Sequence, residues 1–533
     1  MLGWTRKELV LFVLFSTLTL AWSSAPNWAG YAAQDEQSAF AGSYFDVADY
    51  ASHLAMMQSG RAGAWGYEIR FTSEPHRPAY TRLFYVLLGE LSRPFGVEAS
   101  VIFEIARWVF GYAALLSIYL LARRSFAGDV SGGKWLAFFL IVFGSGLGWL
   151  QRTTGWIPGQ LTPIDFWLID AYVLFSLSLF PHFALSLALM CLGWMLYLDF
   201  LSKANWLRIG GVVLAALTVQ LIDPIAFLVI DVAIAATALV HQMMHGRQGD
   251  QHWWAALVIA VAQIPLLLYS LWLYSRDPVW HQYALQHATP SPPPIYYIFG
   301  FGLLWPFALV GSARAVRQRN IILVASLAWV IAAFALAYSP IVLQRRFLFG
   351  ITIPLGLLAA AGVMDILVFA SAAFGLWSGR QHFLAFLLGL SVCMTTLVFV
   401  PAHALYMRTR PEGFFYPMVL QEGFDWVIAN TRPDDVILAA PRTSQLIAQY
   451  TGRRVFAGHE METVGYTSKA AEVEAFYRGL LPSDWLSRYP IAWVVFGPYE
   501  RSLAPGFGPG DPLELVDHVR TLDIYRTRTH LIR

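Results

Sequence analysis

Charged residues are scarce in this sequence of 533 residues, because Asp, Glu, Lys and Arg together make up only 13% of it. Soluble globular domains contain about 25% charged residues, so the composition excludes an ordinary soluble enzyme. The formal net charge is +2, which provides no basic surface for DNA or RNA. Cysteine is also scarce: Cys191 and Cys393 both lie in apolar runs, so neither a disulfide framework nor a cysteine-based metal site is expected.

Hydrophobic residues make up 57% of the chain and aromatic residues 15%, with 21 Trp, as is typical of a protein that crosses a membrane many times. A bilayer requires about 20 apolar residues for each spanning helix. On this basis the sequence predicts eleven transmembrane helices, at 8–25, 99–122, 134–150, 181–202, 206–222, 224–241, 253–275, 295–312, 320–338, 347–370 and 383–402.

The distribution of basic residues predicts how the chain is oriented. Twelve Lys and Arg lie in alternate loops, whereas the short loops between them contain four, namely Arg152, Arg276, Arg345 and Arg346. Because basic loops remain in the cytoplasm, the N-terminus is expected inside the plasma membrane and the C-terminus outside. The long segments 26–98 (the first outer loop) and 403–533 (the C-terminal domain) are then both extracytoplasmic.

The C-terminal domain is predicted from a change in composition. It contains 29 charged residues among 131, against 41 among residues 1–402, which form the predicted membrane domain. Short helices alternate with apolar strands such as IAWVVFGP, a pattern that favours a soluble α/β domain with mostly parallel strands. A last strand pair is expected at 522–525 and 530–532. His459, Glu460 and Glu462 in GHEMET follow a strand, and we interpret them as loop structure.

The first outer loop holds eight of the nineteen acidic residues of the membrane domain. In FDVADYASHLAMMQSG, an amphipathic helix places Asp46, Asp49 and His53 on one face, where they are able to act as a general base or to hold a divalent cation. The pair Asp35–Glu36 is a rival acidic site. Glu74 and His76 in TSEPH are a third, because the residue before a proline is extended. A second amphipathic helix, AYTRLFYVLLGELSR, is expected to lie along the membrane surface.

Further ionisable residues are predicted near the outer face. Asp165 and Asp170 lie in the second outer loop, and His182 at the outer mouth of the fourth span. Arg345 and Arg346 in QRRF stand on the outer side against the positive-inside trend, and guanidinium groups bind phosphate through paired hydrogen bonds. Asp231 lies within a span and favours transport as an alternative function.

The motifs FDVADYASHLAMMQSG, FTSEPH, EIARW and QRRF, in this arrangement of spans and outer loops, resemble the GT-C superfamily of membrane glycosyltransferases. More narrowly, the chain is similar to the RgtA/B/C/D-like and protein-mannosyltransferase-like branches. The resemblance covers most of residues 1–402. The C-terminal domain lacks a signature of the WWD type found in oligosaccharyltransferases.

The resemblance implies transfer of a sugar from a polyprenyl-phosphate carrier to an acceptor hydroxyl at the outer leaflet, typically with inversion. The acceptor is a glycan, lipid or protein, and some members hold a divalent metal ion. Carried over by position, the base is Asp46 or Asp49 and the phosphate partner is Arg345 or Arg346. Asp35–Glu36 also matches the adjacent-acid form that many members use, and Glu74 of TSEPH is a further catalytic candidate. The residues expected to contact substrate are His53, His76, Asp165, Asp170, His182, Arg345 and Arg346. A transporter and a non-catalytic assembly protein are the alternatives.

Overall fold

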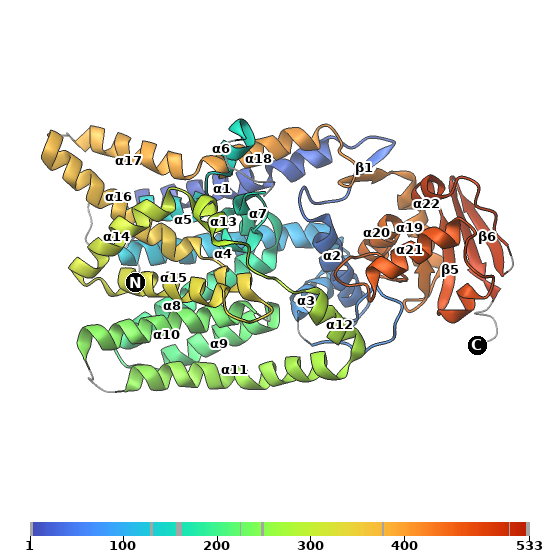
Figure 1. Cartoon of the computed structure of the whole chain (residues 1–533), viewed down its shortest axis with the longest axis horizontal. Helices are drawn as coiled ribbons and strands as arrows, with labels where there is room; N and C mark the ends of the chain where they lie inside the picture. Colours follow the sequence, from blue (N-terminus) through green and yellow to red (C-terminus); the bar gives the residue numbers. More distant parts are fainter. Residues whose placement is uncertain are drawn as a thin grey trace. The chain divides into compact units, whose positions relative to one another are not determined.

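The structure is a computed structural model that describes residues 4–80, 82–127, 132–155, 162–223, 225–246, 250–375, 378–510 and 512–528 (Figure 1). The chain divides into two compact units, each described here by itself. Unit 1 combines Met1–Pro26, Ile105–Leu267 and Thr289–His403, and unit 2 combines Asn27–Glu104, Leu268–Ala288 and Ala404–Arg533.

Six of the described helices are long and apolar enough to cross a membrane, and the number rises to nine if each of three bent helix pairs forms one span. The chain is therefore a multi-pass membrane protein. The six are α1 (Arg6–Ala32), α4 (Ala99–Ser125), α8 (Pro181–Ser202), α10 (Ala226–His245), α11 (Gln251–Arg276) and α16 (Thr352–Phe374).

The other apolar helices are bent or shorter. The bent pairs are α5 (Gly133–Phe143) with α6 (Gly148–Thr154), α13 (Pro294–Phe301) with α14 (Leu304–Gln318), and α17 (Ser378–Val392) with α18 (Met394–Met407). The shorter helices are α7 (Val173–Leu179), α9 (Trp206–Ile222) and α15 (Ile321–Ala337). Each of the eleven predicted spans overlaps a long helix, a bent pair, α9 or α15, although the exact number of spans is not fixed by this agreement.

Three of the predicted spans consist of two helices that meet at a bend. The helices bend by 54° between α5 and α6, by 83° between α13 and α14, and by 59° between α17 and α18. Hydrophobicity predicted where these spans lie, but it carries no information on whether the helix within a span is continuous.

The three breaks meet one another within unit 1. Ser145 N–H donates to the carbonyl of Val392 (3.1 Å), and Leu147 N–H donates to that of Phe299 (2.9 Å). The Thr395 hydroxyl donates to the carbonyl of Gly146 (2.9 Å). A broken helix leaves backbone groups that apolar surroundings cannot satisfy, so each break supplies the partners that another one lacks.

Unit 2 joins the first outer loop to the C-terminal domain. Strand β1 (Ser38–Phe40) pairs antiparallel with β2 (Phe415–Pro417), and Thr72 forms a bridge with Ala457. The two predicted loop helices are confirmed as α2 (Val47–Arg61) and α3 (Leu83–Ser92). Gly60 and Gly89 allow the two helices to cross closely, since a Cβ at either position would collide with the backbone of the other helix. The short helix α12 (Pro278–Gln286) belongs to the same unit.

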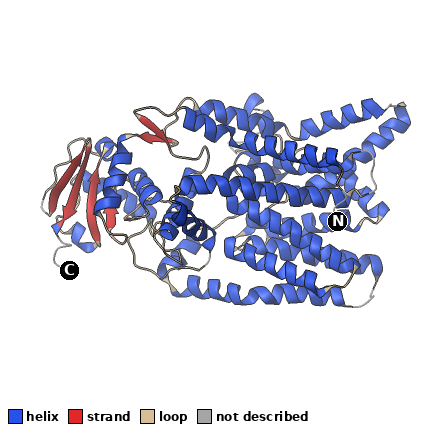
Figure 2. Cartoon of the chain, turned by 180° about the vertical axis from the view of Figure 1, so that it is seen from behind, coloured by secondary structure: helices blue, strands red, loops and turns tan. Residues whose placement is uncertain are grey.

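The C-terminal domain contains a five-stranded sheet of order β4-β3-β5-β7-β6 (Figure 2). Strands β4, β3 and β5 are parallel as predicted, whereas β7 and β6 form an antiparallel hairpin. The predicted strand at 530–532 lies outside the described residues. The strands are β3 (Val436–Leu438), β4 (Arg454–Val455), β5 (Ile491–Phe496), β6 (Leu513–Val519) and β7 (Leu522–Thr527).

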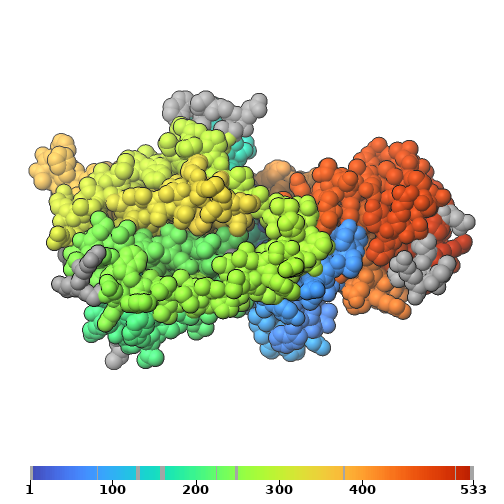
Figure 3. Space-filling model, turned by 60° about the horizontal axis from the view of Figure 1, so that its bottom comes forward, coloured from blue at the N-terminus to red at the C-terminus, as the bar shows by residue number. Residues whose placement is uncertain are grey.

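Helices cover both faces of this sheet. Alternate side chains of a strand point to opposite faces. Val494 and Phe496 pack with Tyr477 of α21 in one buried cluster, whereas Val495 lies beside Phe424 of α19 and Ile447 of α20. The helices are α19 (Val419–Asn430), α20 (Pro441–Thr451), α21 (Tyr466–Tyr477) and α22 (Pro498–Leu503). The space-filling view shows the domain as a continuous orange-to-red surface (Figure 3).

The meeting of the three helix breaks predicts the effect of a single methyl group. In Gly146→Ala the added Cβ collides with the carbonyl oxygens of Phe299 and Gly300. We expect a loss of about 1–3 kcal/mol from overpacking, seen as a lower melting temperature of the detergent-solubilised protein. The control is Gly193→Ala, whose nearest neighbour would be the Ala215 Cβ at 3.8 Å. If Gly146→Ala and Gly193→Ala have the same melting temperature, the close contact between the helix breaks does not contribute to stability.

Candidate active site

The first outer loop places Asp46 at the start of α2. Its backbone is left-handed (φ 47°), and its carboxylate accepts the N–H of Asp49 (3.4 Å) as the helix N-cap. Left-handed backbone is uncommon outside glycine, although aspartate adopts it more readily than most residues. Asp46 therefore precedes the helix in which it was predicted to lie, and both carboxylates stand at the positive end of α2.

His459 of the C-terminal domain lies against Asp49. Its Nε2 is 3.5 Å from the Asp49 carboxylate, and its ring is 3% exposed. The Met461 N–H points at His459 Nδ1 (3.1 Å), so in the neutral ring the proton resides on Nε2, facing Asp49. This contact joins the loop that follows β4 to the first turn of α2.

The two carboxylates are in different electrostatic situations. Burial and the neighbouring charge of Asp49 raise the pKa of Asp46 to about 7. Burial also acts to raise the pKa of Asp49, but the contact with His459 and the positive charge of Arg82 outweigh it and hold that pKa well below its usual range. Together the two groups keep one proton at moderately acidic pH, with Asp46 as the member that titrates near neutrality.

Glu462 is a buried carboxylate that ties the site together. It accepts hydrogen bonds from the Ser52 hydroxyl (2.6 Å) and the Tyr67 hydroxyl (3.1 Å). The Arg82 guanidinium lies 3.5 Å away and also donates to the Tyr283 hydroxyl of α12. Arg82, which has a left-handed backbone (φ 62°), is thereby held between a carboxylate and a phenol, beside the Asp46–Asp49 pair.

His53, which was predicted to contact substrate, is buried within the first outer loop. It is 2% exposed, and its ring stacks on Tyr85 of α3 with centroids 4.1 Å apart. Its charge still acts on Asp49 and helps to lower the pKa of that carboxyl. His53 is thus a buried neighbour of the Asp49 carboxylate, and its contact with substrate stays a prediction.

Glu74 and His76 form local interactions in unit 2. Glu74 pairs with Lys469 (2.6 Å) and accepts a hydrogen bond from the Thr72 hydroxyl. Burial acts to raise its pKa, but Lys469 outweighs burial and lowers it. His76 Nε2 accepts the Ile69 N–H (2.8 Å), so its Nδ1–H donates to the Glu74 carbonyl (2.8 Å). Their predicted roles in chemistry stay predictions.

The rival acidic pair Asp35–Glu36 shapes a turn. The Asp35 carboxylate accepts the N–H groups of Gln37 (3.0 Å) and Ser38 (2.9 Å), and it pairs with Arg410. These contacts anchor the approach to β1.

The remaining predicted contact residues belong to unit 1, in which Asp165 and Asp170 are both buried. Asp165, in the 3-10 helix η2 (Ile164–Phe166), accepts the N–H groups of Gly146 and Gly148 (3.1 Å each) at a helix break. Asp170 pairs with Arg346 (3.0 Å).

Three further predictions concern unit 1. The Arg345 guanidinium lies over Trp167, 5.1 Å from the ring centre. His182 is buried at the start of α8, with its ring 4.1 Å from that of Phe183. Asp231 accepts a hydrogen bond from Gln263 (2.9 Å), so this intramembrane acid has a polar partner within the helices of unit 1. The roles of Arg345 and His182 in binding substrate stay predictions.

No group of three or more His, Cys, Asp or Glu residues with metal-binding geometry occurs in the part of the chain that the structure describes. The Asp46–Asp49 pair is flanked by His459, whose Nε2 lies 3.5 Å from the Asp49 carboxylate, and by the positive charge of Arg82. An imidazole N–H and a guanidinium charge beside the two carboxylates do not fit a resident cation.

Sequence reasoning underestimated the C-terminal contribution. His459 and Glu462 were interpreted as loop structure, and Arg82 as one charge of a surface helix. A signal was available, since GHEMET places ionisable residues directly after a strand, where α/β sheets commonly carry ligands. The sequence alone did not indicate that the GHEMET loop contacts the first outer loop, about 400 residues earlier in the chain.

The fold was compared with known proteins. No protein-family model and no curated protein matches the sequence. Solved structures do match. The oligosaccharyltransferase of Archaeoglobus fulgidus superposes with a TM-score of 0.52 at 13% identity, over 91% of this chain and 69% of that one. The same enzyme with Zn and sulfate gives 0.51 at 12% identity, over 90% and 67%.

A second match is arabinofuranosyltransferase AftD from Mycobacteria, with a TM-score of 0.53 at 13% identity. It covers 98% of this chain and 42% of that one. At such low identity these likenesses establish the fold alone. They agree with the architecture expected from the resemblance to the GT-C superfamily: the chain shares the fold of these two transferases.

Proposed function

We propose that this protein is a membrane glycosyltransferase that transfers a sugar from a polyprenyl-phosphate donor to an acceptor hydroxyl on the extracytoplasmic side of the plasma membrane. The observation that carries the proposal is the Asp46–Asp49 pair. One carboxyl with a pKa of about 7 stands beside an ionised one, and both are held by groups of unit 2. A general base is most effective when its pKa lies near the working pH.

In the proposed step, Asp46 removes the proton from the acceptor hydroxyl as the acceptor oxygen attacks the anomeric carbon. The bond between that carbon and the phosphate oxygen breaks, and the phosphate leaves with the bonding electron pair. The proton stays on the Asp46 carboxyl until solvent accepts it. Asp49 remains ionised throughout, and its negative charge maintains the basicity of Asp46.

The leaving phosphate gains negative charge in this step, so cations that contact it lower the barrier. We assign this role to Arg345. Arg346 is paired with Asp170 (3.0 Å), whereas Arg345 rests on the face of Trp167, an arrangement that leaves the guanidinium edge able to donate to phosphate. The proposal also includes the orientation predicted from the basic loops, with the N-terminus in the cytoplasm and the C-terminal domain outside the membrane.

A divalent metal ion is known from one similar structure, the oligosaccharyltransferase crystallised with Zn and sulfate. In this chain the two carboxylates are flanked by His459 and Arg82. The proposal therefore assigns acid–base work to the side chains themselves.

Replacement of the carboxylates tests the base. Asp46→Asn is expected to lower the rate of transfer by about 10²–10⁴-fold, the usual contribution of a general base. Asp49→Asn should also slow transfer, because it removes the charge that keeps Asp46 basic. The assay follows radiolabelled sugar from a polyprenyl-phosphate donor in membranes that express each variant. Glu36→Gln in the rival pair is the control, and full activity in both aspartate variants would refute the assignment.

The pH dependence should report Asp46. Because transfer requires the ionised carboxylate, kcat/KM is expected to rise with pH, with its midpoint at about 7. His459 lowers the pKa of Asp46, so His459→Asn should move the midpoint to higher pH. The asparagine oxygen is able to accept the Met461 N–H, which preserves the loop. His518→Asn, on the exposed strand β6, is the control, and an unchanged profile in His459→Asn would reduce His459 to a structural residue.

Removal of Arg345 should affect the donor. A hydrogen bond to a charged group contributes about 1.5–3 kcal/mol, so Arg345→Ala is expected to raise the KM for the polyprenyl-phosphate donor by about 10–150-fold. Arg276→Ala, another arginine predicted on the outer side, is the matched control. If Arg345→Ala and Arg276→Ala have the same donor KM, a different cation binds the phosphate.

A further inference from the structure

Helix α12 contacts the candidate site, although it belongs to neither the first outer loop nor the C-terminal domain. It spans Pro278–Gln286 and follows α11 in the sequence. One face of α12 is packed within unit 2, and its buried residues are Val279, Trp280 and Tyr283. Gln286 follows Tyr283 by three positions, so its side chain leaves the helix on the same face.

The helix is fixed to the first outer loop at two places. The Asp277 carboxylate caps α12 by accepting the Trp280 N–H (3.2 Å), and its other oxygen accepts the Arg77 N–H (3.0 Å). Trp280 Nε1–H in turn donates to the Arg77 carbonyl (2.8 Å). One turn further along, the Tyr283 hydroxyl accepts a hydrogen bond from Arg82. The position of α12 relative to the first outer loop is therefore well defined.

The last residue of α12 contacts the GHEMET loop (458–463). The Nε2 of Gln286 donates to the carbonyls of Glu460 (3.0 Å) and Thr463 (3.0 Å). A side-chain amide nitrogen has two N–H donors, and both are used here. The two carbonyls also fix the orientation of the amide, because its oxygen in the same place would face two other acceptors. Gln286 thus bridges two backbone positions of the loop that contains His459.

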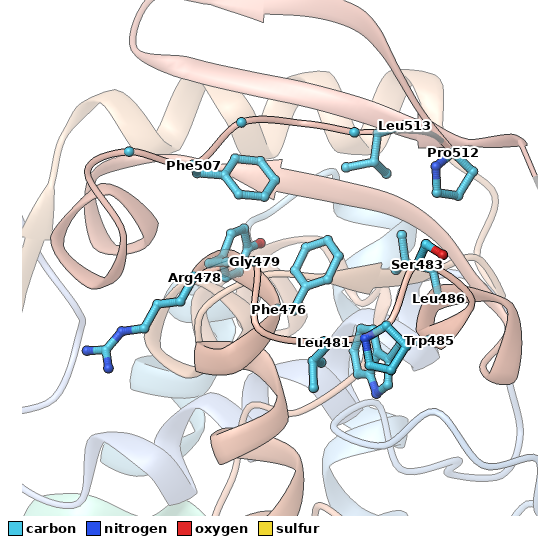
Figure 4. A pocket seen from close by; sticks show the side chains of 15 residues that line it. Phe476, Arg478, Gly479, Leu481, Ser483, Trp485, Leu486, Phe507, Pro512 and Leu513 are labelled. Carbon is cyan, nitrogen blue, oxygen red and sulfur yellow. The ribbon is translucent and has the colours of Figure 1, made fainter.

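The two ends of the GHEMET loop are fixed by the C-terminal domain itself. Before the loop, Val455 of β4 pairs with Ile437 of β3. After the loop, α21 is held by an aromatic cluster at its far end. There the ring centroid of Phe476 lies 5.4 Å from that of Trp485 and 5.9 Å from that of Phe507 (Figure 4). The middle of the loop, in contrast, is held by segments outside the domain.

Within the middle of the loop, Thr463 is held by the first outer loop, because its hydroxyl donates to the Phe71 carbonyl (2.6 Å). Glu460 is exposed, and its carbonyl accepts its hydrogen bond from Gln286. His459 is the residue directly before Glu460 in the chain. The position of the imidazole therefore depends on an amide that belongs to α12.

We propose that Gln286 is a positioning residue of the candidate site: its amide holds the GHEMET loop so that His459 Nε2 stays against the Asp49 carboxylate. The importance of this contact for sugar transfer rests on the proposed function, in which Asp46 is the base. The contact itself requires no substrate. The site is then assembled from three segments, namely the first outer loop, helix α12 and the C-terminal domain.

The protonation of Asp46 reports where His459 lies. Burial and Asp49 raise the pKa of Asp46 to about 7, and His459 acts to lower it. His53 and Arg82 are the further charged groups that act on Asp49. Displacement of His459 should therefore raise the pKa of Asp46. Infrared difference spectroscopy of the full-length protein in detergent follows the C=O band of the protonated carboxyl against pH, and Asp46→Asn identifies the band. No donor or acceptor is added.

Two variants remove both N–H donors of Gln286. Gln286→Met keeps the length of the side chain, whereas Gln286→Leu changes its shape. Both should move the titration midpoint to higher pH than in the wild type, by no more than His459→Asn does. In a His459→Asn background, Gln286→Met should add no further shift, because Gln286 acts through His459. The matched control is Gln282→Met, which removes the same group one turn earlier in α12.

An unchanged midpoint in Gln286→Met overturns the proposal. A shift confined to Gln286→Leu also overturns it, since that result indicates altered packing and not a lost hydrogen bond. The same holds for an equal shift in Gln282→Met, or for an additive shift in the double variant. Equal melting temperatures of Gln286→Met and Gln282→Met exclude general unfolding as the cause of a shift.

The outcome is separable from that of the proposed function. If the midpoint shifts as expected but the protein transfers no sugar, Gln286 retains its positioning role and the proposed function is refuted. If the protein transfers sugar and the midpoint is the same in the wild type and in Gln286→Met, the positioning role is refuted and the proposed function stands.

Discussion

A single buried carboxylate, that of Glu462, holds the candidate site in its observed form. Burying a carboxylate is costly unless its oxygens are hydrogen-bonded and its charge is compensated. Here Ser52 and Tyr67 supply the hydrogen bonds and Arg82 supplies the charge. All three come from the first outer loop, whereas Glu462 comes from the C-terminal domain. The loop and the domain therefore satisfy each other, and neither provides a suitable environment for its polar groups alone.

The arrangement around Glu462 also sets the charges of the proposed chemistry. Arg82 contacts Glu462 and at the same time lowers the pKa of Asp49. His459, three residues before Glu462, contacts Asp49 directly. The ionised Asp49 then raises the pKa of Asp46. The C-terminal domain thus acts on the proposed base through Asp49, and His459 also lowers the pKa of Asp46 directly.

Much of the membrane part was predictable, because the energetics of a bilayer depend on local composition. Every predicted span overlaps an apolar helix or bent pair, since hydrophobic length is a property of consecutive residues. The bends at Gly144–Leu147 and around Cys393 were not predictable in this way. They depend on backbone partners such as Val392 and Phe299, which are distant in the sequence.

Two carboxylates of the candidate site could be singled out from composition alone. Asp46 and Asp49 stood out, because acids are scarce in this chain and these two share one loop. Their inequality did not, because it arises from burial and from His459, about 410 residues away in the sequence. The proposal of Asp46, and not Asp49, as the base therefore rests on contacts that the sequence alone does not contain.

The pairing of β1 with β2 has a consequence for biosynthesis. Strand β1 ends at Phe40 and its partner β2 begins at Phe415, so every span between them is synthesised before the pair forms. Domains usually fold in order as the chain emerges. Here the segment that contains β1 lacks its partner until β2 has been synthesised, and until then Asp49 has no contact with His459. A chain interrupted anywhere between β1 and β2 carries Asp46 and Asp49 but lacks His459, so the difference in pKa between the two carboxyls arises in full only in the finished molecule.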